Sequence, residues 1–267
     1  MSFTLKQIFL FTSIFVTINS SKIETIATMD KKLTEVSAAE ILPNSDLIWV
    51  IEDGGNKNNV YALNETGTIE KSINIENSKN VDWEDLTTDK EGNLYIGDFG
   101  NNSRKRKNFT IYKLTDINRA QENITAEIIN FKLPKDTKSK DFESFFIKDD
   151  CFYLFTKDRK KNSVFRVENV IGDQTAEFVS NYYLKGKNNR VTSADISDDG
   201  DTIVLLNHDK IWEITDFKDD AFFKGHIKAM EFDNDSQKEG VAFKDKNTII
   251  VTDERNKNDG KIYSFKL

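Results

Sequence analysis

The chain has 267 residues, of which 37% are hydrophobic and 11% aromatic, enough for one large core or two small ones. Its formal net charge is −7, so bulk electrostatics disfavour binding to the phosphate backbone of a nucleic acid, and no nucleic acid partner is expected. With one cysteine, an internal disulfide framework is excluded. With two histidines, a histidine-rich zinc site is strongly disfavoured.

The first 21 residues have the composition of a secretory signal peptide. A single lysine precedes the apolar run IFLFTSIFVTI, and small polar residues follow it. A membrane anchor is the alternative, but the run is short for a span of about 20 residues, and no other segment is apolar enough to cross a bilayer. No cysteine lies near its end, which disfavours lipid attachment. We therefore predict a secreted or periplasmic protein without a stable transmembrane span.

The remaining chain repeats one pattern five times. Each copy has a short β-like segment, a turn rich in Asp, Asn, Gly or Lys, and a run of β-branched and aromatic residues, which is typical of a hairpin. The repeating unit averages about fifty residues, the length of one supersecondary unit. The copies are residues 39–53, 84–98, 143–157, 194–208 and 239–253.

Each hairpin is followed by two further predicted strands. The third strand carries an aromatic residue at the same place in all five copies, which are residues 59–63, 110–114, 163–167, 210–214 and 261–265, the first of them NVYAL. Fourth strands are predicted at residues 68–75, 126–133, 177–184 and 222–232. Four antiparallel strands repeated radially form a β-propeller, and the absence of a useful helical periodicity agrees with an all-β chain.

The fifth unit ends at Leu267, after its third strand. Residues 22–30 have strand character, and we expect them to complete this last blade and close the ring, which removes an open sheet edge. The prediction is a five-bladed propeller. Six blades are the alternative, with a degenerate blade inside the long interval between residues 84 and 143. No linker interrupts the repeat, so residues 22–267 are expected to form one domain.

The repeat places acidic residues at both ends of its hairpins. The start of the first strand and the end of the second lie side by side, and the first strand of a blade is next to the axis. Several carboxylates should therefore converge on one mouth of the central channel. The predicted metal ligands there are Glu84, Asp98, Glu143, Glu239 and Asp253.

Carboxylates brought together repel one another and are costly to desolvate. The repulsion is relieved if the groups stay hydrated, take up protons or bind a cation, and an oxygen-rich cluster suits calcium. The alternative, given equal weight, is that these acids hydrogen-bond backbone N–H groups of adjacent loops. Two blades have Ala39 and Ala194 at the first position and an acid one residue later. Those acids, Glu40 and Asp195, are expected on the other face of the strand.

The loops after the second strands contain further candidates. Asn102, Arg159 and Arg255 are predicted to contact a ligand, the arginines through a carboxylate or phosphate group. Tight-turn chemistry and solvated surface arginines are the alternatives. His208 is the one histidine expected at the mouth, which makes it the candidate for general acid or base catalysis.

Two stretches, DWEDLTTDKEGNLYIGDFGNN (82–102) and EGVAF (239–243), resemble secreted bacterial propellers. These are the esterase-like phytase and SdiA-regulated groups and, more loosely, the NHL-repeat and gluconolactonase or regucalcin-like propellers. The resemblance implies calcium at the axis, with acids that open the inner strand facing it. Carried onto this chain, these acids are Glu84, Glu143 and Glu239. Many of these propellers have six or seven blades, whereas five are expected here.

Two classes of function follow from these observations. The first is a binding module that uses the loop face for a small molecule, glycan or protein and has a Ca²⁺-capable axial mouth. The second is a calcium-dependent hydrolase of phosphoester or lactone substrates, phytase-like or gluconolactonase-like. The binding module is favoured because no nucleophile or base is specified by a motif.

Overall fold

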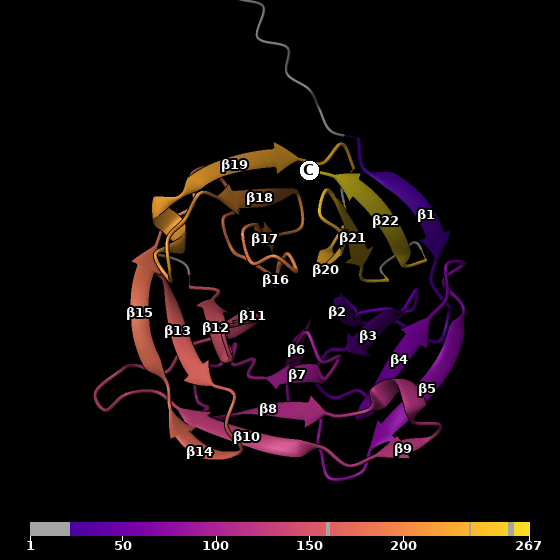
Figure 1. Cartoon of the computed structure of the whole chain (residues 1–267), viewed down its shortest axis with the longest axis horizontal. Coiled ribbons are helices and arrows are strands. Elements are labelled where there is room, and N and C mark those ends of the chain that lie inside the picture. The colour runs from indigo at the N-terminus through magenta and orange to yellow at the C-terminus, as the bar shows by residue number, and fades with distance from the viewer. Residues whose placement is uncertain (1–21, 159–160, 235, 256–258) are drawn as a thin grey trace, which may run out of the picture.

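Five antiparallel sheets are arranged around a central axis in the computed structural model (Figure 1). The structure describes residues 22–158, 161–234, 236–255 and 259–267. Each blade has four antiparallel strands between the axis and the rim, as the hairpin repeat predicts. In four blades these strands follow chain order, and in the last blade the outermost strand comes from the N-terminal side of the described chain. Two of the sheets also have a short fifth strand at the rim. The five-bladed, all-β propeller is therefore confirmed, and no sixth blade is present among these residues.

The blades are numbered 1 to 5 in chain order. Their innermost strands are β2 (Val36–Ile41), β6 (Trp83–Thr88), β11 (Phe142–Lys148), β16 (Ser193–Ile196) and β20 (Lys238–Asp245). The second strands are β3 (Ile48–Glu52), β7 (Leu94–Asp98), β12 (Cys151–Thr156), β17 (Ile203–Leu206) and β21 (Thr248–Asp253). The third strands are β4 (Asn59–Leu63), β8 (Asn108–Leu114), β13 (Asn162–Glu168), β18 (Lys210–Thr215) and β22 (Lys261–Lys266). The outer strands are β5 (Ile69–Ile75), β10 (Glu127–Lys132), β15 (Glu177–Tyr182), β19 (His226–Glu231) and β1 (Glu24–Thr28).

The two ends of the described chain meet in blade 5. Strand β1 pairs antiparallel with β22, from Glu24 opposite Ser264 to Thr28 opposite Lys261. Blade 5 therefore takes its outer strand from the N-terminal side and its other three strands from the C-terminal side (Figure 1). This confirms the closure predicted for residues 22–30. It holds the last blade to the first through main-chain hydrogen bonds.

Two short strands at the rim were not predicted. β9 (Asn123–Ile124) and β14 (Gly172–Thr175) each leave their own blade and pair in parallel with the outer strand of the preceding blade. Asn77 exchanges two side-chain hydrogen bonds of 2.8 Å with the main chain of Ala126, which holds the first of these links in place. Their cross-blade pairing depends on residues far apart in sequence, which a local pattern does not reveal.

The last outer strand begins later than predicted. Residues 222–232 were expected to be extended, but Phe222–Lys224 form the 3₁₀ turn η2 before β19 begins at His226. Phe222 is buried and packs edge-on against Tyr153, with ring centroids 4.9 Å apart. A similar turn, η1 (Ile117–Arg119), precedes β9. Packing between blades has therefore overridden the local strand preference.

The apolar core is divided into five clusters, one between each pair of neighbouring blades. Trp49 and Trp83 are fully buried between blades 1 and 2, and Trp212 between blades 3 and 4. Phe142 contacts four other aromatic rings between blades 2 and 3. Burying both faces of each sheet in this way leaves the polar chemistry to the axis and the loops. No helix in the described part of the chain has the length and apolar character needed to cross a bilayer.

Candidate functional site

Four of the five innermost strands have a bulge at the same place. In β6, Glu84 has no partner on β7, because its two neighbours pair with consecutive residues of that strand. A bulged residue departs from the alternation of the strand, so its side chain takes a new direction. All four bulge residues line one cavity at the mouth of the axis, and they are Ser37, Glu84, Glu143 and Glu239.

We call this the axial cavity, and its lining is strongly acidic. Its volume is about 80 Å³, roughly the space that two or three water molecules occupy at about 30 Å³ each. One lysine, Lys157, faces the carboxylates there, which belong to Glu35, Asp53, Glu84, Glu143, Glu239 and Glu254. The structure thus brings together the three glutamates that open the inner strands. The cavity suits an ion with a few waters rather than a sugar-sized molecule.

Three carboxylates lie especially close together at one side of the axial cavity. Oxygens of Asp53, Asp82 and Glu84 are all within 4.8 Å of one another, and we call these residues the carboxylate trio. Glu84 is 7% exposed, Asp82 is half-buried and Asp53 is exposed. Asp53 comes from the end of blade 1, whereas the other two come from blade 2. The trio therefore bridges two blades.

Two glycines leave the space that the trio occupies. A Cβ on Gly100 would overlap the Glu84 carboxylate and the carboxyl group of Asp82. A Cβ on Gly54 would lie 2.7 Å from Asp82 Oδ1 and 2.8 Å from a main-chain oxygen. Both distances are shorter than real Cβ contacts, so any other residue would displace a carboxylate. The main chain thus forms a cradle around Asp82 and Glu84.

Asp98 supports the trio from behind. Its Oδ1 accepts hydrogen bonds from the Asp82 N–H at 3.1 Å and from Arg106 at 2.9 Å. Arg106 also donates to the carbonyl of Gly100 at 3.0 Å, and the Gly100 N–H donates to the carbonyl of Asp82 at 3.1 Å. These bonds hold the loop of Asp82 against the end of β7. Asp98, predicted as a metal ligand, is placed outside the cavity lining.

Asp253 has a corresponding place in blade 5. Its carboxylate accepts hydrogen bonds from the N–H of Lys261 and from the hydroxyl of Tyr263, the latter at 2.6 Å. It is buried and does not line the cavity. Asp98 and Asp253 are both the last residues of their strands and pair with the residue before the bulge. Their side chains therefore point away from the bulged glutamates.

The residue after the second strand reaches the mouth instead. Asp53, Lys157 and Glu254 each follow the last residue of a second strand, and all three line the axial cavity. Successive residues of an extended chain point to opposite sides, so a shift of one residue decides which side chain enters. Sequence reasoning missed Asp82, Lys157, Glu35 and Glu254 as site residues. A register one residue later would have pointed to Lys157 and Glu254.

Burial makes the carboxyl groups here easier to protonate. It raises the pKa of Glu84 well above its ordinary value, and neighbouring Glu143, Asp53 and Asp82 raise it further. For Asp82, burial followed by the charge of Asp53 raises the pKa to about 6. Burial also raises the pKa of Asp53, and the charge of Glu239 adds to this rise, whereas a hydrogen bond from the Gly54 N–H lowers the pKa. Ionised carboxylates are therefore destabilised together in this cavity.

Lys157 partly offsets this repulsion. Its ammonium donates a 2.7 Å hydrogen bond to Glu143 Oε2, while Glu143 Oε1 is buried without a hydrogen-bond partner among the described residues. Burial raises the pKa of Glu143 to about 7, even though Lys157 acts to lower it. Burial also lowers the pKa of Lys157, but Glu143 and Glu239 outweigh this effect and raise it. The one ammonium group of Lys157 thus interacts electrostatically with several carboxylates.

The remaining predicted residues lie around or outside this cavity. His208 Nε2 is 3.0 Å from Glu239 Oε1, and its side chain is 47% exposed. Asn102 lines the cavity. Arg255 does not line the cavity, and its guanidinium donates a hydrogen bond to the carbonyl of Lys31 at 2.7 Å. Arg159 lies outside the described residues.

No protein-family model matches the chain, and no curated protein matches it in sequence. Among solved structures, it is similar to the PQQ-bound aldose sugar dehydrogenase of Streptomyces coelicolor, with a TM-score of 0.55 and 9% identity over 92% of this chain and 98% of that one. It is also similar to a Xanthomonas campestris gluconolactonase, with a TM-score of 0.52 and 7% identity over 93% of this chain and 90% of that one.

A third similar structure is the selenomethionine-substituted virginiamycin B lyase of Staphylococcus aureus. The TM-score is 0.45 and the identity 16%, and the match covers 87% of this chain and 66% of the lyase. The chain therefore spans less than two thirds of that protein. At 9% and 7% identity, the likeness to the dehydrogenase and to the gluconolactonase concerns the fold alone.

Proposed function

We propose that this protein is a secreted propeller binding module whose axial mouth holds a calcium ion on Asp53, Asp82 and Glu84. The observation that carries the proposal is the approach of these three carboxylates to within 4.8 Å of one another in a cradle that a Cβ would fill. Calcium takes hard oxygen ligands in irregular arrangements and tolerates water among them. Glu143 and Glu239 supply further carboxylate oxygens in the same cavity, and Glu143 Oε1 has no hydrogen-bond partner among the described residues.

A cation at this place would join two blades. Asp53 belongs to blade 1, and the other two members of the trio belong to blade 2. The Asn80 amide already donates to the carbonyls of Glu52 and Asp53, at 2.8 and 3.0 Å, across the same boundary. The cation would relieve the repulsion among the ionised carboxylates there. The ligand on the loop face would be a small molecule, glycan or protein.

Calorimetric titration of calcium into residues 22–267 tests the proposal. We expect a dissociation constant of about 1 mM or tighter, the range of extracellular calcium modules. Glu84→Gln should weaken binding at least tenfold. Glu91→Gln, a matched change at an exposed turn residue, should leave it unchanged. Equal affinities for all three proteins, or no heat of binding, would contradict the proposal.

A calcium-dependent hydrolase of phosphoester or lactone substrates is the second candidate. Two observations favour it. Burial raises the pKa of Glu143 to about 7, and its Oε1 has no hydrogen-bond partner among the described residues. His208 Nε2 lies 3.0 Å from Glu239 Oε1, and Glu239 lines the axial cavity. A group that titrates near the working pH suits proton transfer. A bound cation would polarise the substrate and activate a water molecule. Residues of the chain would then orient the substrate and carry the proton.

The hydrolase is tested with p-nitrophenyl phosphate and gluconolactone in the presence of calcium. We expect Glu143→Gln to lower kcat/KM at least a hundredfold, in the range of general acid–base effects. Glu91→Gln serves again as the control. Turnover that is the same in both variants, or absent from the wild type, would contradict the hydrolase. The binding module would then be the one proposed function.

Export of the chain is the remaining part of the proposal. Residues 1–21 have the composition of a signal peptide, and they lie outside the described residues. Mass spectrometry of the protein recovered outside the cytoplasm should show a mature N-terminus close to Lys22. An intact N-terminus on exported protein would favour an uncleaved anchor instead.

A further inference from the structure

Blade 1 contains a second and larger cavity, which we call the blade-1 cavity. It has a volume of about 390 Å³, within the usual range of small-molecule sites, whereas the axial cavity has about 80 Å³. The link from β1 to β2 forms one side, and strands β3 to β5 with the β3–β4 loop form the other. A molecule of monosaccharide size fits this volume.

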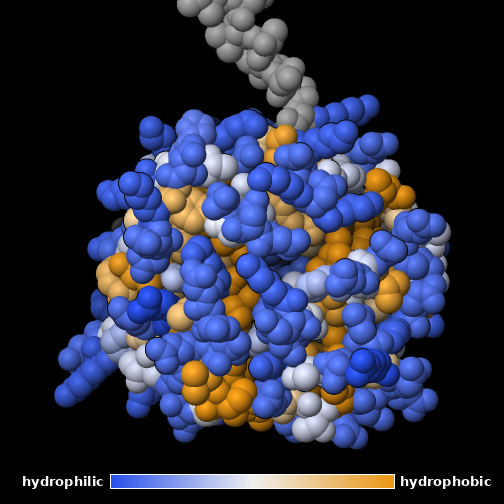
Figure 2. All heavy atoms as spheres, in the orientation of Figure 1, coloured by the Kyte–Doolittle hydropathy of each residue, from blue (hydrophilic) through white to orange (hydrophobic). Residues whose placement is uncertain are grey.

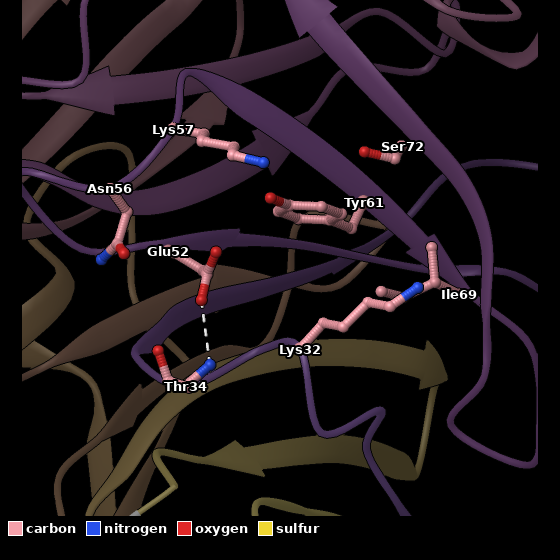
Figure 3. Close-up of a pocket in the computed structure, with 8 residues that line it drawn as sticks. All are labelled: Lys32, Thr34, Glu52, Asn56, Lys57, Tyr61, Ile69 and Ser72. Carbon is pink, nitrogen blue, oxygen red and sulfur yellow. Dashed lines mark hydrogen bonds between the residues drawn. The ribbon is translucent and has the colours of Figure 1, made fainter.

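The cavity presents two lysines and one carboxylate, that of Glu52. Figure 3 shows Lys57 extending over the cavity toward the phenol oxygen of Tyr61, while Lys32 runs along another side toward Ile69. Within the described residues, neither ammonium group makes a hydrogen bond or an ion pair. Ammonium groups that face a concave site attract carboxylate and phosphate groups. Since the two ammonium groups outnumber the single Glu52 carboxylate of this lining, the expected ligand is negatively charged.

Glu52 and several uncharged polar groups form the floor and walls. Tyr61 is 8% exposed, and burial, together with Glu52, raises its pKa to about 12, so that the phenol stays protonated at neutral pH. Glu52 is itself held by the Thr34 N–H at 2.9 Å (Figure 3). The Ser72 hydroxyl and the Asn56 amide line the same cavity. Such donors and acceptors suit the hydroxyl groups of a ligand.

The two cavities share a wall. Asn56 lines the blade-1 cavity and donates a 2.7 Å hydrogen bond to Glu35 Oε2, and Glu35 lines the axial cavity. Two consecutive residues also line different cavities, since Glu52 lines the blade-1 cavity and Asp53 lines the axial cavity. A molecule in the blade-1 cavity would thus lie beside the carboxylate trio.

We propose that the blade-1 cavity binds a hydroxylated small anion of about monosaccharide size, whose carboxylate or phosphate group is held by Lys32 and Lys57. Its place next to the axial carboxylates makes it the ligand site of the binding module, and this last step rests on the proposed function. The anion site itself does not need the cation.

The test is calorimetric titration of residues 22–267, in the presence of a chelator, with four probes: glucuronate, glucose 6-phosphate, glucose and inorganic phosphate. We expect at least one of the two sugar acids to bind at least tenfold more tightly than glucose or phosphate alone. The preferred acid then identifies the carboxylate or the phosphate as the recognised group. Equal or absent binding of all four probes would overturn the proposal.

Variants locate the site. The double variant Lys32→Gln with Lys57→Gln should bind the preferred sugar acid at least tenfold more weakly. Tyr61→Phe should bind it several-fold more weakly. Lys90→Gln with Lys244→Gln removes the same charge from two exposed lysines outside both cavities and should have no effect. An equal loss in both double variants would overturn the proposal, since it would show only an effect of net charge. The single variant Lys57→Gln gives the same comparison if the double variant folds poorly.

The two proposals fail separately. Glu84→Gln should remove calcium binding but leave the affinity for the sugar acid in chelator unchanged. If calcium does not bind and the sugar acid does, the anion site stands and the calcium proposal falls. If the sugar acid binds but is insensitive to Lys32 and Lys57, the anion site is overturned and the calcium proposal is unaffected.

Discussion

Glu84 and Asp85 are neighbours on β6, yet they lie in opposite environments. Asp85 is fully buried, and its carboxylate accepts hydrogen bonds from the Phe145 N–H at 3.0 Å, the Ser193 hydroxyl at 2.9 Å and the Ala194 N–H at 3.2 Å. It therefore ties blade 2 to blades 3 and 4. Glu84, one residue earlier, faces other carboxylates in the axial cavity.

The difference shows how one strand uses two acids for two purposes. A carboxylate that receives several hydrogen bonds can be buried as a structural link, whereas one surrounded by like charges needs a proton or a cation. Asp195 also links two blades, because it accepts a 2.7 Å hydrogen bond from the Phe243 N–H of the next blade, although burial raises its pKa to about 7. Both interpretations of the acids in the sequence thus apply, to different residues.

The largest expected effect comes from removing the structural link. Asp85→Ala leaves three donors without their acceptor, and we expect the free energy of unfolding to fall by about 3 kcal/mol or more. Urea denaturation followed by tryptophan fluorescence measures this loss. Calcium affinity per folded molecule should change little.

Two controls sharpen that comparison. Asp85→Asn keeps one acceptor oxygen and should lose less stability than the alanine variant. Glu91→Ala changes an exposed acid on the β6–β7 turn, where the loss should be within about 0.5 kcal/mol. If Asp85→Ala were no more costly than Glu91→Ala, the carboxylate would not be a structural link.

The next effect is a pH dependence that calcium removes. The pKa rises on folding from 4.5 to about 7 for Glu143 and from 3.8 to about 6 for Asp82. The folded chain then binds more protons than the unfolded chain between these values, so stability falls as the pH rises from about 4 through 7. Calcium binds the ionised carboxylates, so it should restore stability at the upper end of that range.

Thermal melts at pH 5 and pH 8, with calcium or with chelator, test this expectation. At saturating calcium we expect a rise in Tm of about 5 °C at pH 8 and a much smaller one at pH 5. Glu84→Gln should reduce the rise at pH 8. An equal effect of calcium at both pH values would show that the axial carboxylates are not the responsive groups.

The smallest effect concerns the internal counter-charge. Lys157→Met removes the ammonium that offsets the axial carboxylates, and we expect calcium affinity to rise about tenfold at pH 8. Lys140→Met is the matched control, because Lys140 is also 20% exposed and makes a 2.7 Å ion pair, with Asp158. Calorimetry measures both. Unchanged affinity in Lys157→Met would show that the cation binds away from Lys157.

Much of the architecture follows from the sequence alone. Alternating apolar residues and turn signals mark the hairpins, because strand periodicity and turn conformations are local properties. Repetition of the hairpin along the whole chain, and a strand-like segment before the first copy, indicate a closed ring. The convergence of Glu84, Glu143 and Glu239 follows from the place of the first strand beside the axis.

Only the tertiary structure decides which side chains share the mouth. Each of the four bulges shifts the register within its own blade by one residue. Asp53 and Lys157 therefore enter the axial cavity, while Asp98 and Asp253 turn to hydrogen-bond donors behind it. A bulge depends on how a strand pairs with its neighbour, and the repeat pattern alone does not give this pairing residue by residue. Partners on neighbouring blades are also separated by many residues in sequence, and their contacts exist only once the blades have packed together.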